Sequence, residues 1–135
     1  MNFITELKNA ILNEDFYETN EVIEKIKQEG NAFEYLPFIF EVMEKNPELD
    51  YGMPGPVVHF MESYYRKGYE GLLLKSVQKM PTSHTVWMLN RVINDPKLSN
   101  RKMYIDVLKS SLNRKDISQT VRKDIEEFLK YQKNK

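Results

Sequence analysis

His59 and Glu62 stand three positions apart in a stretch with helical periodicity, a spacing that places both side chains on one face of a helix. Such pairs ligate metals in di-iron helical bundles, where the motif occurs twice together with further carboxylates. In this chain the other histidine, His84, is followed three positions later by Trp87 instead of an acid. The sequence therefore predicts no bound metal and no other cofactor.

Catalysis would require more functional groups than this pair provides. The chain contains no phosphate-binding loop, dinucleotide-binding glycine motif, zinc-protease motif, serine-hydrolase motif or calcium-binding loop, and it has no cysteine. His59, Glu62 and His84 are the catalytic set that the residue types would allow, and an enzyme built on them is the least favoured of three hypotheses. We therefore predict that the protein is not an enzyme.

His84, Trp87 and Arg91 recur at spacings of three and four, so they share one face of a predicted helix. Tryptophan offers a broad stacking surface and arginine a planar, always-charged group, which together suit a protein loop, a nucleobase or an anion. A tryptophan beside Val86 and Leu89 is better explained by burial in the core, and His84 is explained by a position in the first helical turn. Both interpretations stay open from the sequence.

Charge is divided unevenly along the chain. Residues 1–50 contain twelve acidic residues and four lysines, whereas residues 51–135 contain eight acidic residues and sixteen lysines or arginines. Such asymmetry indicates an oppositely charged partner, because a surface of one sign steers charged molecules toward it. Alternatively, the two halves complement each other or the charges lie on solvated faces. Candidates for contact with a basic protein, such as a nuclease, are Glu14, Asp15, Glu18, Glu21 and Glu24. Further candidates for contact with the protein partner are His59, Glu62, His84, Trp87 and Arg91.

The basic second half suggests nucleic-acid binding as the alternative function. A ridge of lysines and arginines along successive helical turns would meet a phosphate backbone. Against this, the sequence pI is about 6.7, and acidic residues are interleaved with the basic ones. The residues of the possible ridge are Lys97, Arg101, Lys102, Lys109, Arg114, Lys115, Arg122 and Lys123.

Apolar residues recur at spacings of three and four along almost the whole chain, which is typical of amphipathic helices. Leu12, Phe16 and Met103 belong to these apolar stripes and are expected to face the core. Glycine, proline and capping residues divide the pattern into segments, and no strand pattern competes with it. The eight expected helices cover residues 3–12, 15–30, 31–45, 56–67, 69–79, 84–93, 100–112 and 118 onward.

Helices joined by short turns and arriving in pairs match helical-hairpin solenoids such as HEAT arrays. We predict an all-α fold of consecutive antiparallel hairpins in a HEAT-like superhelix, with an irregular helical bundle as the alternative. A chain of 135 residues suits one helical domain covering 1–135. No apolar run reaches the roughly 20 residues that cross a bilayer, and Met1–Asp15 is too acidic for a signal peptide. We therefore expect a cytoplasmic protein without a membrane partner.

Residues 52–94 combine a glycine-proline turn with three motifs, GMPGPVVHFME, KGYEGLLLKS and PTSHTVWMLNRVIN. This stretch resembles small helical immunity proteins of bacterial polymorphic-toxin and contact-dependent inhibition systems. The resemblance implies a compact helical protein that binds and neutralises a cognate protein toxin without catalysing a reaction. It leaves open whether Gly52–Glu62 and Pro81–Asn94 serve the scaffold or the toxin contact. We therefore predict a non-catalytic protein-binding module, and we expect the glycine-proline turn to orient the fourth helix.

Overall fold

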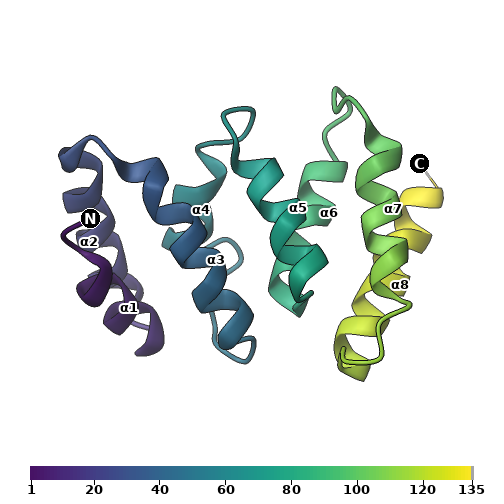
Figure 1. Ribbon diagram of the computed structural model, residues 1–135, viewed down its shortest axis with the longest axis horizontal. Coiled ribbons are helices and arrows are strands. Elements are labelled where there is room, and N and C mark those ends of the chain that lie inside the picture. The colour runs from purple at the N-terminus through teal and green to yellow at the C-terminus, as the bar shows by residue number, and fades with distance from the viewer. Residues whose placement is uncertain (135) are drawn as a thin grey trace. The chain divides into compact units, whose positions relative to one another are not determined.

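A computed structural model of the chain describes residues 1–134. Within them the chain forms eight α-helices and one 3-10 helix and no strand (Figure 1). The predicted all-α class is therefore confirmed. The described chain divides into two compact units, Met1–Tyr69 and a second unit that begins at Glu70. No helix in residues 1–134 is both long enough and apolar enough to cross a membrane.

The first unit is built around α2 (Phe16–Glu29), which packs against both α1 (Ile4–Leu12) and α4 (Pro56–Glu62). The chain between α2 and α4 forms the 3-10 helix η1 (Ala32–Tyr35) and α3 (Leu36–Lys45). Every one of these elements contributes apolar side chains to the core of the unit. Fully buried members of this core are Leu7, Val22, Ile26, Leu36, Ile39, Met43, Val58 and Met61.

Local chemistry explains where the helices of the first unit begin and end. The Asp15 carboxylate accepts a hydrogen bond of 3.0 Å from the amide of Glu18 and caps α2, and Gly30 closes α2 in the left-handed conformation. The helix predicted over 31–45 is instead η1 followed by α3. Pro37 lies in the first turn of α3, where its missing amide costs no helical hydrogen bond.

The glycine-proline segment forms a tight turn between α3 and α4. Pro56 is the first residue of α4, and a Cβ added to Gly55 would collide with the carbonyl oxygen of Tyr51. Tyr51 is buried, and its hydroxyl donates a hydrogen bond of 2.7 Å to the carbonyl of Asn46 at the end of α3. The turn is therefore held to the end of α3 and leads directly into α4.

The fourth helix is shorter than the sequence predicts, since it ends at Glu62 and residues 63–68 continue as turns. The amide of Tyr64 bonds to the carbonyl three residues before it, a tighter geometry than that of an α-helix. In this turn the Tyr64 ring packs 5.3 Å from the Phe33 ring and 5.9 Å from the Phe60 ring, measured between centroids. Aromatic packing therefore accompanies the early end of the helix.

The second unit contains α5 (Tyr69–Lys79), which starts at the unit boundary, α6 (Ser83–Ile93), α7 (Arg101–Ser111) and α8 (Gln119–Lys133). Helix α8 packs against both α6 and α7. Thr82 and Thr85 form a reciprocal capping box at the start of α6, and the Ser118 hydroxyl caps α8. The fully buried apolar side chains of this unit include Leu73, Val77, Val86, Met88, Leu89, Ile93, Leu108 and Ile125.

Successive hairpins pack through their second helices. Helix α2 contacts α4 in the first unit, and α6 contacts α8 in the second. This is the neighbour pattern that stacked helical hairpins require. The predicted consecutive-hairpin arrangement is therefore found within each unit, whereas a superhelical path over the whole chain stays a prediction.

Three residues that the sequence assigned to apolar stripes are exposed in the structure. The exposed fractions are 37% for Leu12, 40% for Phe16 and 47% for Met103. Leu12 is the last residue of α1, Phe16 the first of α2, and Met103 lies in the first turn of α7. At the end of a helix the apolar pattern of the sequence can persist where no neighbouring helix covers the side chain. The prediction that these three residues are buried was therefore wrong.

A buried amide network joins three helices of the second unit. The side-chain amide of Gln132 donates hydrogen bonds of 2.8 Å to both Asn90 Oδ1 and Asn94 Oδ1. Its carbonyl oxygen accepts a hydrogen bond of 3.3 Å from Arg101 Nη1. The end of α8 is thereby held to α6 and to the start of α7.

Replacing Gly55 with alanine should lower the free energy of unfolding by about 1 to 3 kcal/mol, because the added methyl collides with backbone that has no room to move. Gly71 is the matched control, since its added Cβ meets nothing within 4 Å on an exposed part of α5. Gly71→Ala should raise stability by about 0.5 to 1 kcal/mol. Urea unfolding followed by circular dichroism measures both, and a Gly55→Ala protein as stable as wild type would contradict the packing of the turn.

Gln132→Leu should destabilise the protein by about 1 to 3 kcal/mol, because it leaves the buried Asn90 carboxamide without its hydrogen-bond donor. Gln119→Leu, at an exposed position in the first turn of α8, should change stability little. Equal thermal melting midpoints for the two variants would exclude a stabilising role of the network.

Candidate protein-binding surfaces

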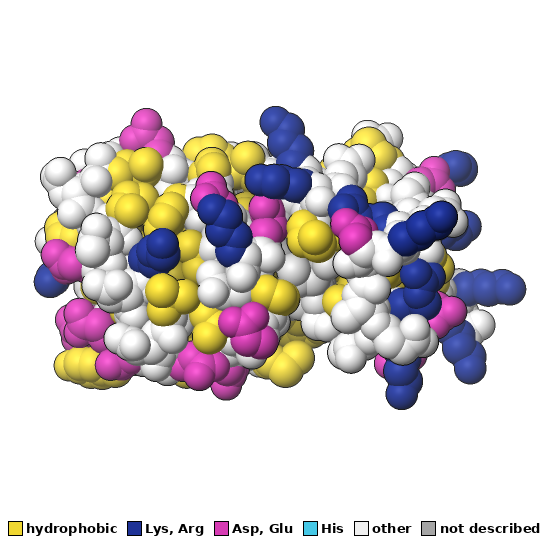
Figure 2. All heavy atoms as spheres, turned by 60° about the horizontal axis from the view of Figure 1, so that its bottom comes forward, with side chains coloured by type: hydrophobic (Ala, Val, Ile, Leu, Met, Phe, Trp, Pro, Cys, Tyr) yellow, Lys and Arg dark blue, Asp and Glu magenta, His cyan; other side chains and the backbone are white. Residues whose placement is uncertain are grey.

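The charge asymmetry of the sequence follows the boundary between the two units. Met1–Tyr69 contains thirteen acidic residues and six lysines or arginines, and the chain from Glu70 contains seven acidic residues and fourteen lysines or arginines. In Figure 2, blue side chains gather over the helices of the second unit, and magenta ones lie beside yellow ones over the first. The two units therefore carry net charges of opposite sign.

An acidic surface with apolar side chains in it lies where α1 turns into α2. Tyr17 is 77% exposed, the largest exposed fraction among the large apolar side chains of residues 1–134, and Phe16 and Leu12 are its exposed neighbours. Carboxylates precede and follow these side chains along the chain. We define this surface, the acidic aromatic patch, by Leu12, Glu14, Asp15, Phe16, Tyr17, Glu18 and Glu21.

The carboxylates of the patch differ in their local roles. Glu14, with a backbone φ of 53°, accepts a hydrogen bond of 2.6 Å from the amide of Asp50, and Asp15 caps α2. Glu21 lies one helical turn after Tyr17, and the interaction of its carboxylate with the tyrosine hydroxyl raises the pKa of Tyr17. Two of the predicted acidic residues therefore shape the turn, while Glu21 lies beside the exposed aromatic ring.

Glu24 lies further along α2, where Lys27 Nζ is 3.5 Å from its carboxylate. All five predicted acidic residues, Glu14 to Glu24, thus lie on the turn or on α2. The sequence prediction named these acids and missed Phe16 and Tyr17 as exposed residues. The feature of the sequence that could have identified them is a pair of aromatic residues enclosed by acids at the start of a helix.

His59 and Glu62, the other candidate site residues of the first unit, lie on α4. His59 is exposed and lines a shallow groove of about 310 Å³ with Asn20 and Lys27 of α2, whereas Glu62 is half-buried. Among residues 1–134, no three histidine, aspartate or glutamate side chains come together in a way that could hold a metal ion. The groove is therefore a polar surface feature beside α2.

His84, Trp87 and Arg91 come together on one face of α6, as their spacing predicts. The His84 and Trp87 ring centroids are 5.1 Å apart with an interplanar angle of 62°, and the Arg91 guanidinium carbon lies 4.9 Å from the Trp87 ring centroid. Trp87 is half-buried, while Val86 and Leu89 beside it are fully buried. The tryptophan is thus neither a core residue nor a free surface ring, because one cation covers part of it.

Four of the eight residues of the predicted basic ridge are hydrogen-bonded within the second unit. Arg122 donates to the carbonyls of Leu112 and Arg114, at 2.7 and 3.0 Å, and so closes the end of α7. Arg114 itself binds both carboxylate oxygens of Asp116 and lowers the pKa of that acid.

Lys102 pairs with Asp106 at 2.8 Å, and Arg101 bonds to Gln132 and to the carbonyl of Asp95. Three arginines of the ridge are thus bound by the scaffold, and Lys102 forms a surface ion pair. The other four candidates, Lys97, Lys109, Lys115 and Lys123, are exposed. The continuous basic ridge that a phosphate backbone needs is therefore interrupted.

Comparison of the chain with protein-family models, with curated proteins and with solved structures finds no match. The resemblance of residues 52–94 to immunity proteins accordingly stays a prediction.

Removing the cation from Trp87 should make the ring more accessible to water. The chain has one tryptophan, so its fluorescence reports on α6 alone. Arg91→Ala should increase acrylamide quenching and shift the emission to longer wavelength, because the guanidinium covers one face of the ring. Arg66→Ala, which removes a cation 5.6 Å from the Tyr65 ring, is the matched control and should leave Trp87 emission unchanged. Unchanged quenching in Arg91→Ala would show that the stack does not form.

Proposed function

We propose that this protein is a non-catalytic protein-binding module and that the acidic aromatic patch of the first unit is its binding surface. The observation that carries the proposal is the exposure of Tyr17 and Phe16 among carboxylates. Aromatic side chains at the centre of a contact supply most of the binding energy in protein interfaces, and surrounding charges supply selectivity and association rate. A basic protein with an apolar recess fits this surface.

The hydrogen bonds within the patch support the same proposal. A segment that is already ordered loses less conformational entropy when a partner binds it. Glu14 and Asp15 fix the turn through backbone amides. The turn that carries the aromatic side chains is thereby ordered before binding.

The partner class we propose is a cognate protein toxin, which makes the module an immunity protein. The motifs at 52–62, 67–76 and 81–94 support this through their resemblance to that class. An acidic surface suits a basic toxin such as a nuclease, because it can occupy the cationic groups that otherwise hold a phosphate backbone. The interrupted basic ridge of the second unit favours this function over nucleic-acid binding.

Tyr17→Ala should weaken the complex by about 2 kcal/mol or more, because it removes the central apolar contact. Tyr131→Ala is the matched control, since Tyr131 is an exposed tyrosine on α8. Biolayer interferometry against the immobilised partner measures both variants. Equal affinities would place the interface elsewhere on the molecule.

The double variant Glu18→Lys/Glu21→Lys should slow association and make it less sensitive to salt, because electrostatic steering acts mainly on the association rate. Glu126→Lys/Glu127→Lys introduces the same change in charge on exposed positions of α8. A comparable loss of rate in both double variants would indicate an effect of total charge instead of the patch.

Co-expression identifies the toxin itself. The reading frame next to this gene is expressed with and without this protein, and growth and complex formation are followed. Killing only in its absence, together with a co-purifying one-to-one complex, is the expected result. Growth that is unaffected in both arms would overturn the toxin assignment, and the binding experiments above would then test the module function with other partners.

A further inference from the structure

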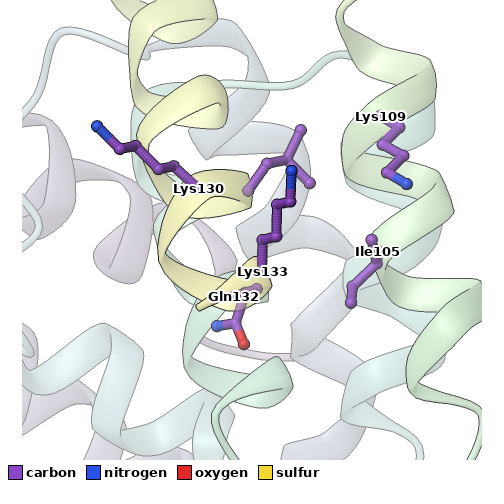
Figure 3. Close-up of a pocket in the computed structure, with 6 residues that line it drawn as sticks. Ile105, Lys109, Lys130, Gln132 and Lys133 are labelled. Atoms are coloured by element: carbon purple, nitrogen blue, oxygen red, sulfur yellow. The ribbon is translucent and has the colours of Figure 1, made fainter. Parts of the chain in front are cut away.

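A groove of about 670 Å³ runs between α7 and α8 of the second unit. Its floor is apolar and consists of Ile105 from α7 and Leu129 from α8, and Gln132 closes one side. Figure 3 shows Ile105 and Lys109 on α7, Lys133 between the two helices, and Lys130 extending from α8 on the side away from α7. The groove therefore combines an apolar floor with a cationic rim.

The rim lysines are available to a ligand. Within residues 1–134, Lys109, Lys130 and Lys133 make no hydrogen bond or ion pair through their ammonium groups, unlike Lys102, which pairs with Asp106 on the same helix α7. All three belong to the last turn of a helix, where a cation offsets the partial negative charge of the helix end. That effect accounts for cations at these positions but not for an apolar floor between them.

Gln132 makes the site more rigid than a surface crevice. Its side chain is held by the network to Asn90, Asn94 and Arg101, so the wall that it forms is fixed to α6 and α7. A preformed groove between two helices is a common receptor for an apolar side chain of a bound peptide segment.

The chemistry of the groove selects among anionic partners. A phosphate backbone is bound by cations along a continuous track and gains little from an apolar floor. A segment with a large apolar side chain between carboxylates satisfies both parts of the groove, since the side chain covers Ile105 and Leu129 while the carboxylates meet the lysines. The volume of about 670 Å³ lies within the range of ligand-binding pockets.

We propose that the α7–α8 groove is a second binding site, which takes an acidic protein segment with a large apolar side chain flanked by carboxylates. The site is independent of the acidic aromatic patch, because it lies in the other unit and carries the opposite charge. It allows the protein to engage a second partner, or a second region of one partner, with an acidic character.

The test uses the full chain and a fluorescein-labelled hexapeptide in which phenylalanine and leucine are flanked on each side by two glutamates. Fluorescence anisotropy at low salt should show saturable binding. Lys109→Glu/Lys130→Glu/Lys133→Glu should weaken it by at least about tenfold, as expected for the loss of three surface ion pairs. Lys97→Glu/Lys115→Glu/Lys123→Glu alters net charge equally at exposed positions outside the groove and should retain most of the affinity.

Two further peptides test the two parts of the site. Replacing phenylalanine and leucine by serines removes the side chains that contact the floor, and replacing the glutamates by serines removes the carboxylates that meet the rim. Each of the two replacements should abolish binding. If circular dichroism shows the groove triple variant to be less stable than its control, Lys109→Gln/Lys133→Gln takes its place.

Several results would overturn the proposal. One is equal weakening by the groove and control variants, and another is equal binding of the serine-substituted and apolar peptides. A third is absence of peptide binding together with groove-dependent binding of a DNA duplex or of phosphatidylglycerol vesicles, which would assign the groove to polyanions or to lipid instead. None of these outcomes depends on a toxin, so failure here is distinct from failure of the proposed function.

Discussion

The burial of one stripe of α2 against α1 and α4 determines what the first unit presents to solvent. Val22 and Ile26 are completely buried, and because residues three and four apart share a helix face, the opposite face must stay in water. Tyr17 and Glu21, which are four positions apart, lie on that opposite face. The patch is therefore a consequence of how α2 packs, and Tyr17 is exposed because it lies away from the buried stripe.

Charge on this protein has two distinct uses. Arg122 and Arg114 bond to backbone carbonyls and to Asp116, so they stabilise the turn from α7 to α8 and have little left for a partner. Lys109 and Lys133 keep their ammonium groups in solvent at the groove. A count of basic residues cannot separate these uses, because an arginine that closes a helix end and one that binds a phosphate are the same residue type.

The segments that carry the family resemblance are occupied largely by the scaffold. Gly55 is required by the close approach of the Tyr51 backbone, Thr82 and Thr85 cap α6, and Asn90 accepts a hydrogen bond from Gln132. Other positions of the same motifs reach the surface, among them His59, Trp87 and Arg91. A motif of this kind describes how helices begin and meet, which explains why it does not specify a partner.

The sequence by itself determined the all-α class, the approximate positions of the helices, and the shared face of His84, Trp87 and Arg91. These follow from spacing and from contacts over a few residues, which are local in the chain. The tertiary structure alone decided that Phe16 and Tyr17 are exposed, that Arg122 serves α7, and that Lys109 and Lys133 rim one groove. Exposure and grooves depend on which distant helices lie beside a residue, and no local spacing contains that information.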